Sequence, residues 1–214
     1  MSRSLRIDKN RRRPYLFLPF LLTALIAGCS LGSSKPSYMV NQYTLEYPPP
    51  VWKEVTSINE LVRVEPFSSA QTFNTSAMVY KEGPNLRNVD PYNRWRTRPG
   101  EMTTECLVRD LRNSGLFRGV VSYGDRAENR YVLEGQVDEF LDVSEKDGRK
   151  AVLGINVTVL DLKNKSGMIF QRDYKATEPY TERTAAGFAQ GMSRAMEKIS
   201  KQIIRDLQDS LKGR

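Results

Sequence analysis

The residues with the clearest capacity for chemistry lie near the start of the chain, where the run Leu-Ile-Ala-Gly-Cys at 25–29 ends in a cysteine. This spacing resembles the bacterial lipobox, in which a signal peptidase cuts between Gly28 and Cys29 and the cysteine thiol then carries lipid with acyl chains such as palmitate. Six basic residues and a short apolar run at 15–26 precede it, as in an export signal. The pattern predicts a lipoprotein signal peptide over residues 1–28 and a lipid on Cys29.

Two other interpretations of this segment stay open: a retained transmembrane anchor and an ordinary cleaved signal peptide. A helix that spans a bilayer needs about 20 apolar residues. The apolar run here is shorter and contains Pro19, with Pro14 just before it. The length therefore favours the lipoprotein signal.

The charge of the chain depends on whether that segment is counted. The whole sequence has a formal net charge of +8. Residues 1–28 hold six basic residues and one acidic residue, so the mature chain keeps 27 basic and 24 acidic residues, a net charge of +3. This is the balance of an ordinary solvated surface, and we expect no nucleic-acid partner.

Residues with catalytic or metal-binding capacity are scarce. Histidine is absent from the sequence, which removes Ser-His-Asp and Cys-His nucleophile systems and the commonest transition-metal ligand. Cys106 is the only cysteine besides Cys29, so no disulfide is expected within the mature chain, and its helical surroundings indicate a small buried hydrophobic residue. We expect no enzyme activity, no catalytic residues, no metal ion and no cofactor, and ligand-binding residues stay unassigned.

Residues 29–37 are predicted to form the lipidated N-terminus and a short tether of small and polar residues. Fully extended, residues 30–37 reach about 28 Å, so the folded domain is expected close to the membrane that holds Cys29. Ser30 stands where an aspartate would retain such proteins in the inner membrane. By resemblance to other Gram-negative lipoproteins, this favours the periplasmic face of the outer membrane.

The mature chain opens with sequence typical of β-structure. Aromatic, aliphatic and β-branched residues predict three strands before the first helix, at 38–47, 61–67 and 77–80. Residues 81–98 are typical of a polar loop. Its aromatic residues Tyr92 and Trp95 are expected to dock on the core rather than form an exposed contact.

A first helix is predicted from Pro99 to Ser114. Proline suits the first helical turn, Glu101 lies near the positive end of the helix dipole, and Gly115 suits a left-handed cap. A short strand at 116–121 is expected to follow.

The second half of the chain has the most regular pattern. Alternating apolar and polar residues from 130 to 179 predict an antiparallel meander of three strands with one packed face. A helix at 182–211 follows, with Thr181 as N-cap, and Gly187 and Gly191 indicate close packing on the sheet. At about 45 Å this helix exceeds what a small sheet needs. Its last turns would either contact a partner, such as a second copy of the chain, or fray.

The order of these elements predicts an α+β fold. Grouped strands with few helices favour a two-layer sandwich, with a mainly antiparallel sheet, two helices on one face and a long C-terminal helix. Residues 38–214 are expected to form a single periplasmic domain.

An ordered set of short motifs follows the lipobox and extends to the end of the chain. They are an aromatic-x-Leu strand at 43–45, Leu-Val-Arg-Val at 61–64, Tyr-x-x-Trp-x-x-x-Pro at 92–99, Ser-Gly-Leu-Phe at 114–117, Tyr-x-Leu-x-Gly at 131–135, Val-Leu-Asp at 159–161 and an alanine-rich terminal helix. Together they resemble the ABC-type transport auxiliary lipoproteins, the PqiC-like group. The order of the motifs along the chain carries the resemblance.

The resemblance implies an outer-membrane lipoprotein that faces the periplasm. It would act as a non-catalytic docking component for an ABC transporter and an MCE-type periplasmic protein that move lipids or other hydrophobic molecules between membranes. Self-association into rings occurs in some members of the group, so a homo-oligomer is a further implied partner.

Two other classes of function stay open on the residues alone. The first is a structural or assembly lipoprotein for outer-membrane or cell-wall biogenesis, since one fold serves many functions. The second is a histidine-free enzyme such as a carboxylate-dependent hydrolase, which would require a convergent acid pair in a deep pocket.

Overall fold

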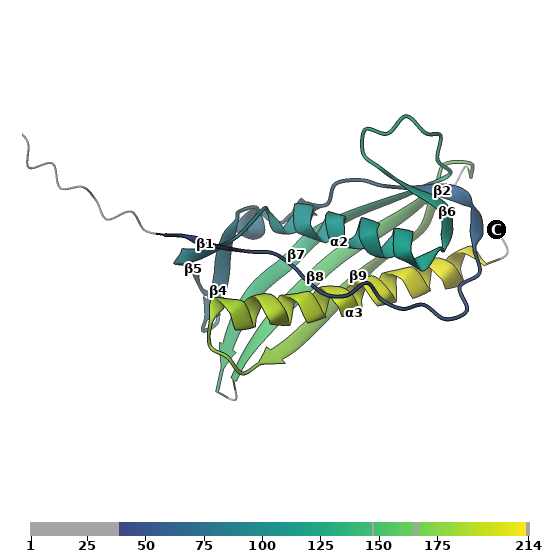
Figure 1. Ribbon diagram of the computed structural model, residues 1–214. Helices are drawn as coiled ribbons and strands as arrows, with labels where there is room; N and C mark the ends of the chain where they lie inside the picture. Colours follow the sequence, from purple (N-terminus) through teal and green to yellow (C-terminus); the bar gives the residue numbers. More distant parts are fainter. Residues whose placement is uncertain (1–38, 147, 165–166, 213–214) are drawn as a thin grey trace, which may run out of the picture. The chain divides into compact units, whose positions relative to one another are not determined.

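The computed structural model describes residues 39–146, 148–164 and 167–212, which adopt an α+β fold (Figure 1). The elements, in chain order, are β1 (Asn41–Tyr43), β2 (Ile58–Val64), β3 (Ser68–Ser69), the 3-10 helix η3 (Gln71–Phe73), β4 (Ala77–Glu82), β5 (Leu86–Trp95), α2 (Pro99–Ser114), β6 (Phe117–Ser122), β7 (Tyr131–Glu145), β8 (Gly148–Asp161), β9 (Met168–Tyr180) and α3 (Ala185–Leu211). The predicted α+β class with two helices is confirmed.

The framework of the sheet is the meander of β7, β8 and β9, whose two pairings are both antiparallel. Its apolar positions face the helices, and Leu133, Val137 and Leu153 are fully buried. Alternation of side chains between the two faces of a strand produces this division. The predicted three-stranded meander is confirmed.

The other edge of β7 takes three short strands in succession, namely β2, β3 and β4. Each runs in the same direction as β7, so each pairing is parallel, and β6 then joins β2 in parallel while β5 joins β4 in antiparallel order. Of the eight pairings among the described residues, five are parallel, although the longest are antiparallel. The sheet is therefore a curled, half-barrel, mixed sheet, and the prediction of a mainly antiparallel two-layer sandwich is not confirmed.

The helices begin and end close to the predicted residues. Helix α2 starts at Pro99 and is capped by Gly115, whose φ of 66° is the left-handed conformation that glycine adopts without strain. Helix α3 begins at Ala185, not at residue 182, because the Thr184 side chain accepts a hydrogen bond from the Gly187 N–H at 3.1 Å. The prediction of Thr181 as N-cap is wrong.

Both helices cover the same face of the sheet (Figure 1). A Cβ atom added to Gly191 would lie 2.8 Å from the Ala151 Cβ on β8, so glycine at this position permits the close helix–sheet packing that was predicted. The end of α3 is also packed within the chain, because Leu207 and Leu211 are buried. The apolar side chains of its last turns therefore pack against the rest of the described chain.

Two segments differ from the predicted secondary structure. The expected strand at 38–47 is reduced to β1, and residues 44–57, which we call the strap, form neither helix nor strand. The expected polar loop at 81–98 is largely the strand β5, because Asp90 and Pro91 interrupt its alternation in sequence without ending its pairing. Trp95 is fully buried as expected, whereas 51% of the Tyr92 surface is exposed.

Candidate functional site

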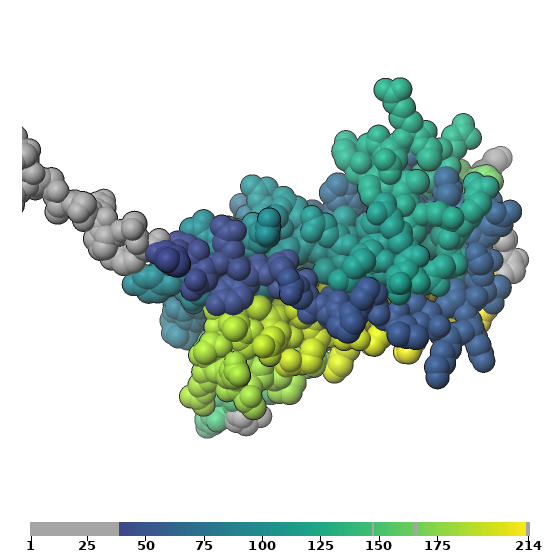
Figure 2. Space-filling view, viewed as in Figure 1, coloured from purple at the N-terminus to yellow at the C-terminus, as the bar shows by residue number. Residues whose placement is uncertain are grey.

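The strap lies between α2 and α3 and is held by both helices. The Tyr47 hydroxyl donates to the Asp110 Oδ2 on α2 at 2.7 Å, and the Glu46 N–H donates to the Ser193 Oγ on α3 at 3.0 Å. Farther along, the Asn113 Nδ2 donates to the Pro50 carbonyl at 2.9 Å. Figure 2 shows the strap, in dark blue, on the surface beside α3 in yellow-green. These bonds fix the segment that leads into the folded domain.

A polar cluster of Tyr47, Cys106, Arg109 and Asp110 lies where the strap crosses α2. The fully buried Asp110 accepts from the Arg109 Nε at 2.9 Å, and the Arg109 guanidinium lies 4.2 Å from the centre of the Tyr47 ring. Burial raises the pKa of Tyr47 well above its ordinary value and raises the pKa of Cys106 to about 11. Tyr47 and Cys106 are therefore neutral near pH 7, and the cluster is a structural anchor without an activated nucleophile.

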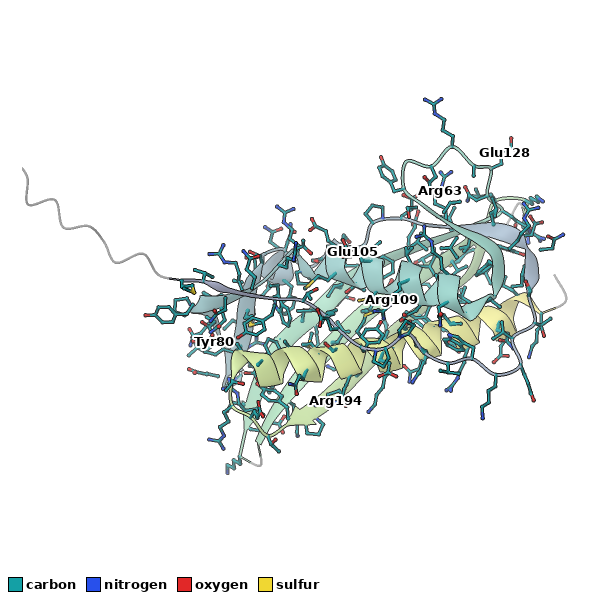
Figure 3. The ribbon with its side chains drawn as sticks, viewed as in Figure 1. Arg63, Tyr80, Glu105, Arg109, Glu128 and Arg194 are labelled. Atoms are coloured by element: carbon teal, nitrogen blue, oxygen red, sulfur yellow. The ribbon has the colours of Figure 1, made fainter. Side chains whose placement is uncertain are left out.

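The outward surface of α2 forms the floor of an open groove with a volume of ≈ 840 Å³. We call it the α2 groove, and its principal lining residues are Pro49, Val64, Pro66, Val108, Arg112 and Tyr123. The strap forms one wall, and the ends of β2 and β6 form the other. Glu105 and Arg109 project from α2 at its margin (Figure 3). An apolar lining with a few charged groups at the margin suits a hydrophobic ligand or a partner's apolar side chains.

Arg112 connects the groove to the edge of the sheet. Its Nε and Nη2 both donate to the Val120 carbonyl on β6, at 3.3 and 3.2 Å. β6 is the last strand on its side of the sheet, so its outer backbone groups have no neighbouring strand to pair with. The Arg112 side chain therefore binds a carbonyl that an added strand would otherwise use. A ligand or partner in the groove would therefore contact mainly side chains and not the unpaired backbone of an edge strand.

A second buried carboxylate, that of Asp142, lines a cavity of ≈ 390 Å³ beside the start of α3. There Asp142 on β7 pairs with Arg149 on β8. Burial, followed by a hydrogen bond to Asp142, raises the pKa of Tyr180. The charges are paired with each other, so we interpret this group as structural.

The structure locates only some of the residues singled out in the sequence. Gly28, Cys29 and the tether lie outside the described residues. Cys106 is buried and forms no disulfide, as expected. No group of three or more His, Cys, Asp or Glu side chains that could hold a metal ion occurs among the residues that the structure describes. In the same part of the chain, no helix is long and apolar enough to cross a membrane.

The α2 groove was missed because it combines residues from the strap, β2, α2 and β6. One signal was present in the sequence. In the sequence of α2, Met102, Cys106, Leu107 and Leu111 recur at helical spacing as an apolar stripe, and Val108 lies outside this stripe. An apolar residue on the polar side of a helix indicates a second packed surface, and Val108 is buried and also lines the groove.

The fold places an open apolar groove on a sheet whose one face is covered by two helices. The chain matches the family described as the ABC-type transport auxiliary lipoprotein component over residues 43–204, and it belongs to that family. Membership supports an accessory role in ABC-type transport and an anchored lipoprotein.

Solved structures show the same fold at low sequence identity. A Xanthomonas campestris protein of the DUF330 family has a TM-score of 0.70 and 15% identity, covering 80% of this chain and 95% of its own. An uncharacterized protein has a TM-score of 0.63 and 15% identity, covering 79% of this chain and 99% of its own. No match is found among the curated proteins.

Proposed function

We propose that this chain is a non-catalytic docking lipoprotein of an MCE-associated ABC-type system that moves lipids or other hydrophobic molecules between membranes. The observation that carries the proposal is the family match, which spans most of the folded residues. An MCE-type periplasmic protein and the subunits of the ABC transporter are the proposed partners, and a second copy of the chain is another.

The site chemistry supports a binding role. The α2 groove is mainly apolar, and Glu105 is the only carboxylate among its described lining residues, so the groove has no convergent acid pair. The buried carboxylate nearby, Asp110, is occupied by Arg109 and Tyr47. A hydrolase that depends on two carboxylates has no support from this arrangement.

The anchor and the location follow from the export signal. We propose that cleavage before Cys29 leaves a lipid on that residue and that Ser30 directs the protein to the periplasmic face of the outer membrane. Residues 38–214 then form the periplasmic domain. Because the tether is short, the α2 groove stays within reach of partners near that membrane.

Crosslinking in native envelopes tests the proposal. The full chain should capture an MCE-type protein or transporter subunits, and lipid should co-purify with the complex. Tyr123→Glu places a charge on an exposed side chain that lines the groove and should reduce capture, whereas Arg118→Glu changes an exposed residue on β6 outside the groove and should leave capture unchanged. Recovery of cell-wall synthases or outer-membrane assembly proteins alone would favour a structural lipoprotein instead.

A further inference from the structure

The strands β4 and β5 form a hairpin at the place where the chain enters the folded domain. The described residues begin at Met39, and β1 follows at once and pairs with the end of β5, with Asn41 opposite Asn93. Figure 1 shows β1, β4 and β5 at one end of the domain and the C-terminus of α3 at the other. The hairpin therefore lies at the tethered end.

This end exposes an unusual share of large apolar side chains. Leu86, Val89 and Tyr92 on β5 are 52%, 54% and 51% exposed, and Met39 is 86% exposed. They are four of the eight large hydrophobic residues that the described part of the chain exposes. Among the described residues, β1 pairs only with residues 93–95 of β5, and no strand pairs with that edge of β5 at residues 86–92. Grouped exposed apolar residues are typical of an interaction surface, whereas single ones are common everywhere.

The same segment carries the positive charge of the mature chain. Residues 77–98 contain five basic and two acidic residues, a net charge of +3. The mature chain from Cys29 onward also has a net charge of +3, so the rest of it is balanced. The basic residues of the hairpin and its continuation are Lys81, Arg87, Arg94, Arg96 and Arg98.

The acids of this segment accept hydrogen bonds from neighbouring residues of the hairpin. Asp90 accepts from the N–H groups of Tyr92 and Asn93 at 2.8 and 3.0 Å, and Glu82 accepts from the Asn88 Nδ2 at 3.1 Å.

Arg87 donates to the carbonyls of Pro84 and Leu86 within the hairpin. Within the described ranges, no ion pair involves Arg87, Arg94 or Arg96. The hairpin therefore offers cationic groups to an external anion.

We propose that this surface, which consists of Met39, Leu86, Arg87, Val89, Tyr92, Arg94 and Arg96 and which we call the hairpin end, docks on the anionic bilayer that holds the lipid of Cys29. The proposal rests on the anchor proposed above. Cys29 precedes Met39 by ten residues, so the anchor lies within about 35 Å of the hairpin end. Exposed aliphatic and aromatic side chains enter the headgroup region, and arginines contact lipid phosphates. Docking would orient the opposite end of the domain away from the membrane.

Vesicle co-sedimentation tests the docking without the lipid anchor. The probe protein is the mature chain with Cys29→Ser, and the vesicles are phosphatidylcholine alone or phosphatidylcholine with phosphatidylglycerol. Binding should require the anionic lipid and weaken with added salt. Arg87→Glu with Arg94→Glu should reduce the partition coefficient about tenfold or more, and Leu86→Ser with Val89→Ser should also reduce it.

A matched control carries the same change of charge elsewhere. Arg118→Glu with Arg126→Glu alters two exposed arginines on β6 and the loop after it, and it should leave binding within about twofold of the parent. Thermal unfolding of each variant checks that the fold is retained. Equal loss in the control, equal binding to neutral vesicles, or no binding at all would overturn the proposal.

Two further readouts separate this proposal from its alternatives. If the hairpin end is instead a contact between copies of the chain, the Arg87→Glu and Arg94→Glu variant will change the sedimentation coefficient of the protein without vesicles. If vesicle binding fails while envelope crosslinking still captures transport partners, the proposed docking of the hairpin end on the membrane is wrong, and the proposed accessory role in transport is retained. If the protein binds vesicles but crosslinking captures no transport partners, the proposed accessory role is wrong and the proposed membrane docking is retained.

Discussion

The strap side of α2 and the hairpin end each have an arginine close to a tyrosine, but the arginine is bound within the fold in the first region and exposed in the second. On α2, Arg109 is held between the Tyr47 ring and the buried carboxylate of Asp110. At the hairpin end, Arg94 is exposed and forms no ion pair among the described residues, and the neighbouring Tyr92 is half exposed. The difference shows that burial and neighbouring groups, not residue type, decide whether an arginine stabilises the fold or is available to a partner.

The largest expected effect contrasts two aromatic residues of β5. Trp95 is fully buried, with its ring centre 5.1 Å from that of Phe140 and 5.3 Å from that of Phe188. Trp95→Ala should lower the free energy of unfolding by about 4 kcal/mol, because it removes contacts and leaves a cavity. Tyr92→Ala should lower it by less than about 1 kcal/mol. Urea titration measures both, and similar losses would contradict the division of β5 into a buried and an exposed part.

The next effect concerns the buried charge on α2. Asp110→Ala removes the acceptor of the Tyr47 hydroxyl and the partner of Arg109, and it should cost about 3 kcal/mol of stability. Asp209→Ala changes an exposed acid near the end of α3 and should alter stability by less than about 0.5 kcal/mol. A small loss for Asp110→Ala in denaturant unfolding would show that the strap is not anchored through this carboxylate.

The buried thiol predicts a pH dependence. Cys106 has a folded-state pKa of about 11, above its ordinary value near 9.0, so the folded chain holds a proton that the unfolded chain loses between these values. The contribution of Cys106 to the free energy of unfolding is full below pH 9. It falls by about 2 kcal/mol as the pH rises from 9 to 11. Cys106→Ala should reduce the fall in stability over that range, as unfolding curves at several pH values would show. Fast alkylation of the native thiol at pH 8 would contradict its burial.

The smallest effect isolates one hydrogen bond. Tyr47→Phe keeps the ring under Arg109 and removes the 2.7 Å bond to Asp110, so the free energy of unfolding should fall by about 1–2 kcal/mol. Tyr43→Phe is the matched control, because no hydrogen bond of its hydroxyl is described, and it should change stability by less than about 0.5 kcal/mol. Equal losses in thermal or chemical unfolding would remove the hydrogen bond as the cause.

Local patterns predicted the elements that are governed by local physics. The meander from β7 to β9 follows from alternation over long strands, and α2 follows from Pro99, its apolar stripe and the Gly115 cap. The strand β5 was missed because Asp90 and Pro91 are typical of turns, and the start of α3 was misplaced by three residues because either Thr181 or Thr184 suits an N-cap. Whether residues 86–95 form a strand depends on their pairing partner, and which threonine caps α3 depends on which N–H group its side chain binds. Neither can be read from a short stretch of sequence.

The sequence by itself determined the α+β class, the meander, the two helices and the burial of Trp95 and Cys106, because each depends on periodicity or on the chemistry of one residue. Only the tertiary structure decided that β2, β3 and β4 run parallel along one edge of β7, since alternation of side chains is the same for either strand direction. It also decided the α2 groove and the difference between Arg109 and Arg94. Those properties come from residues far apart in the chain that folding brings together or leaves apart.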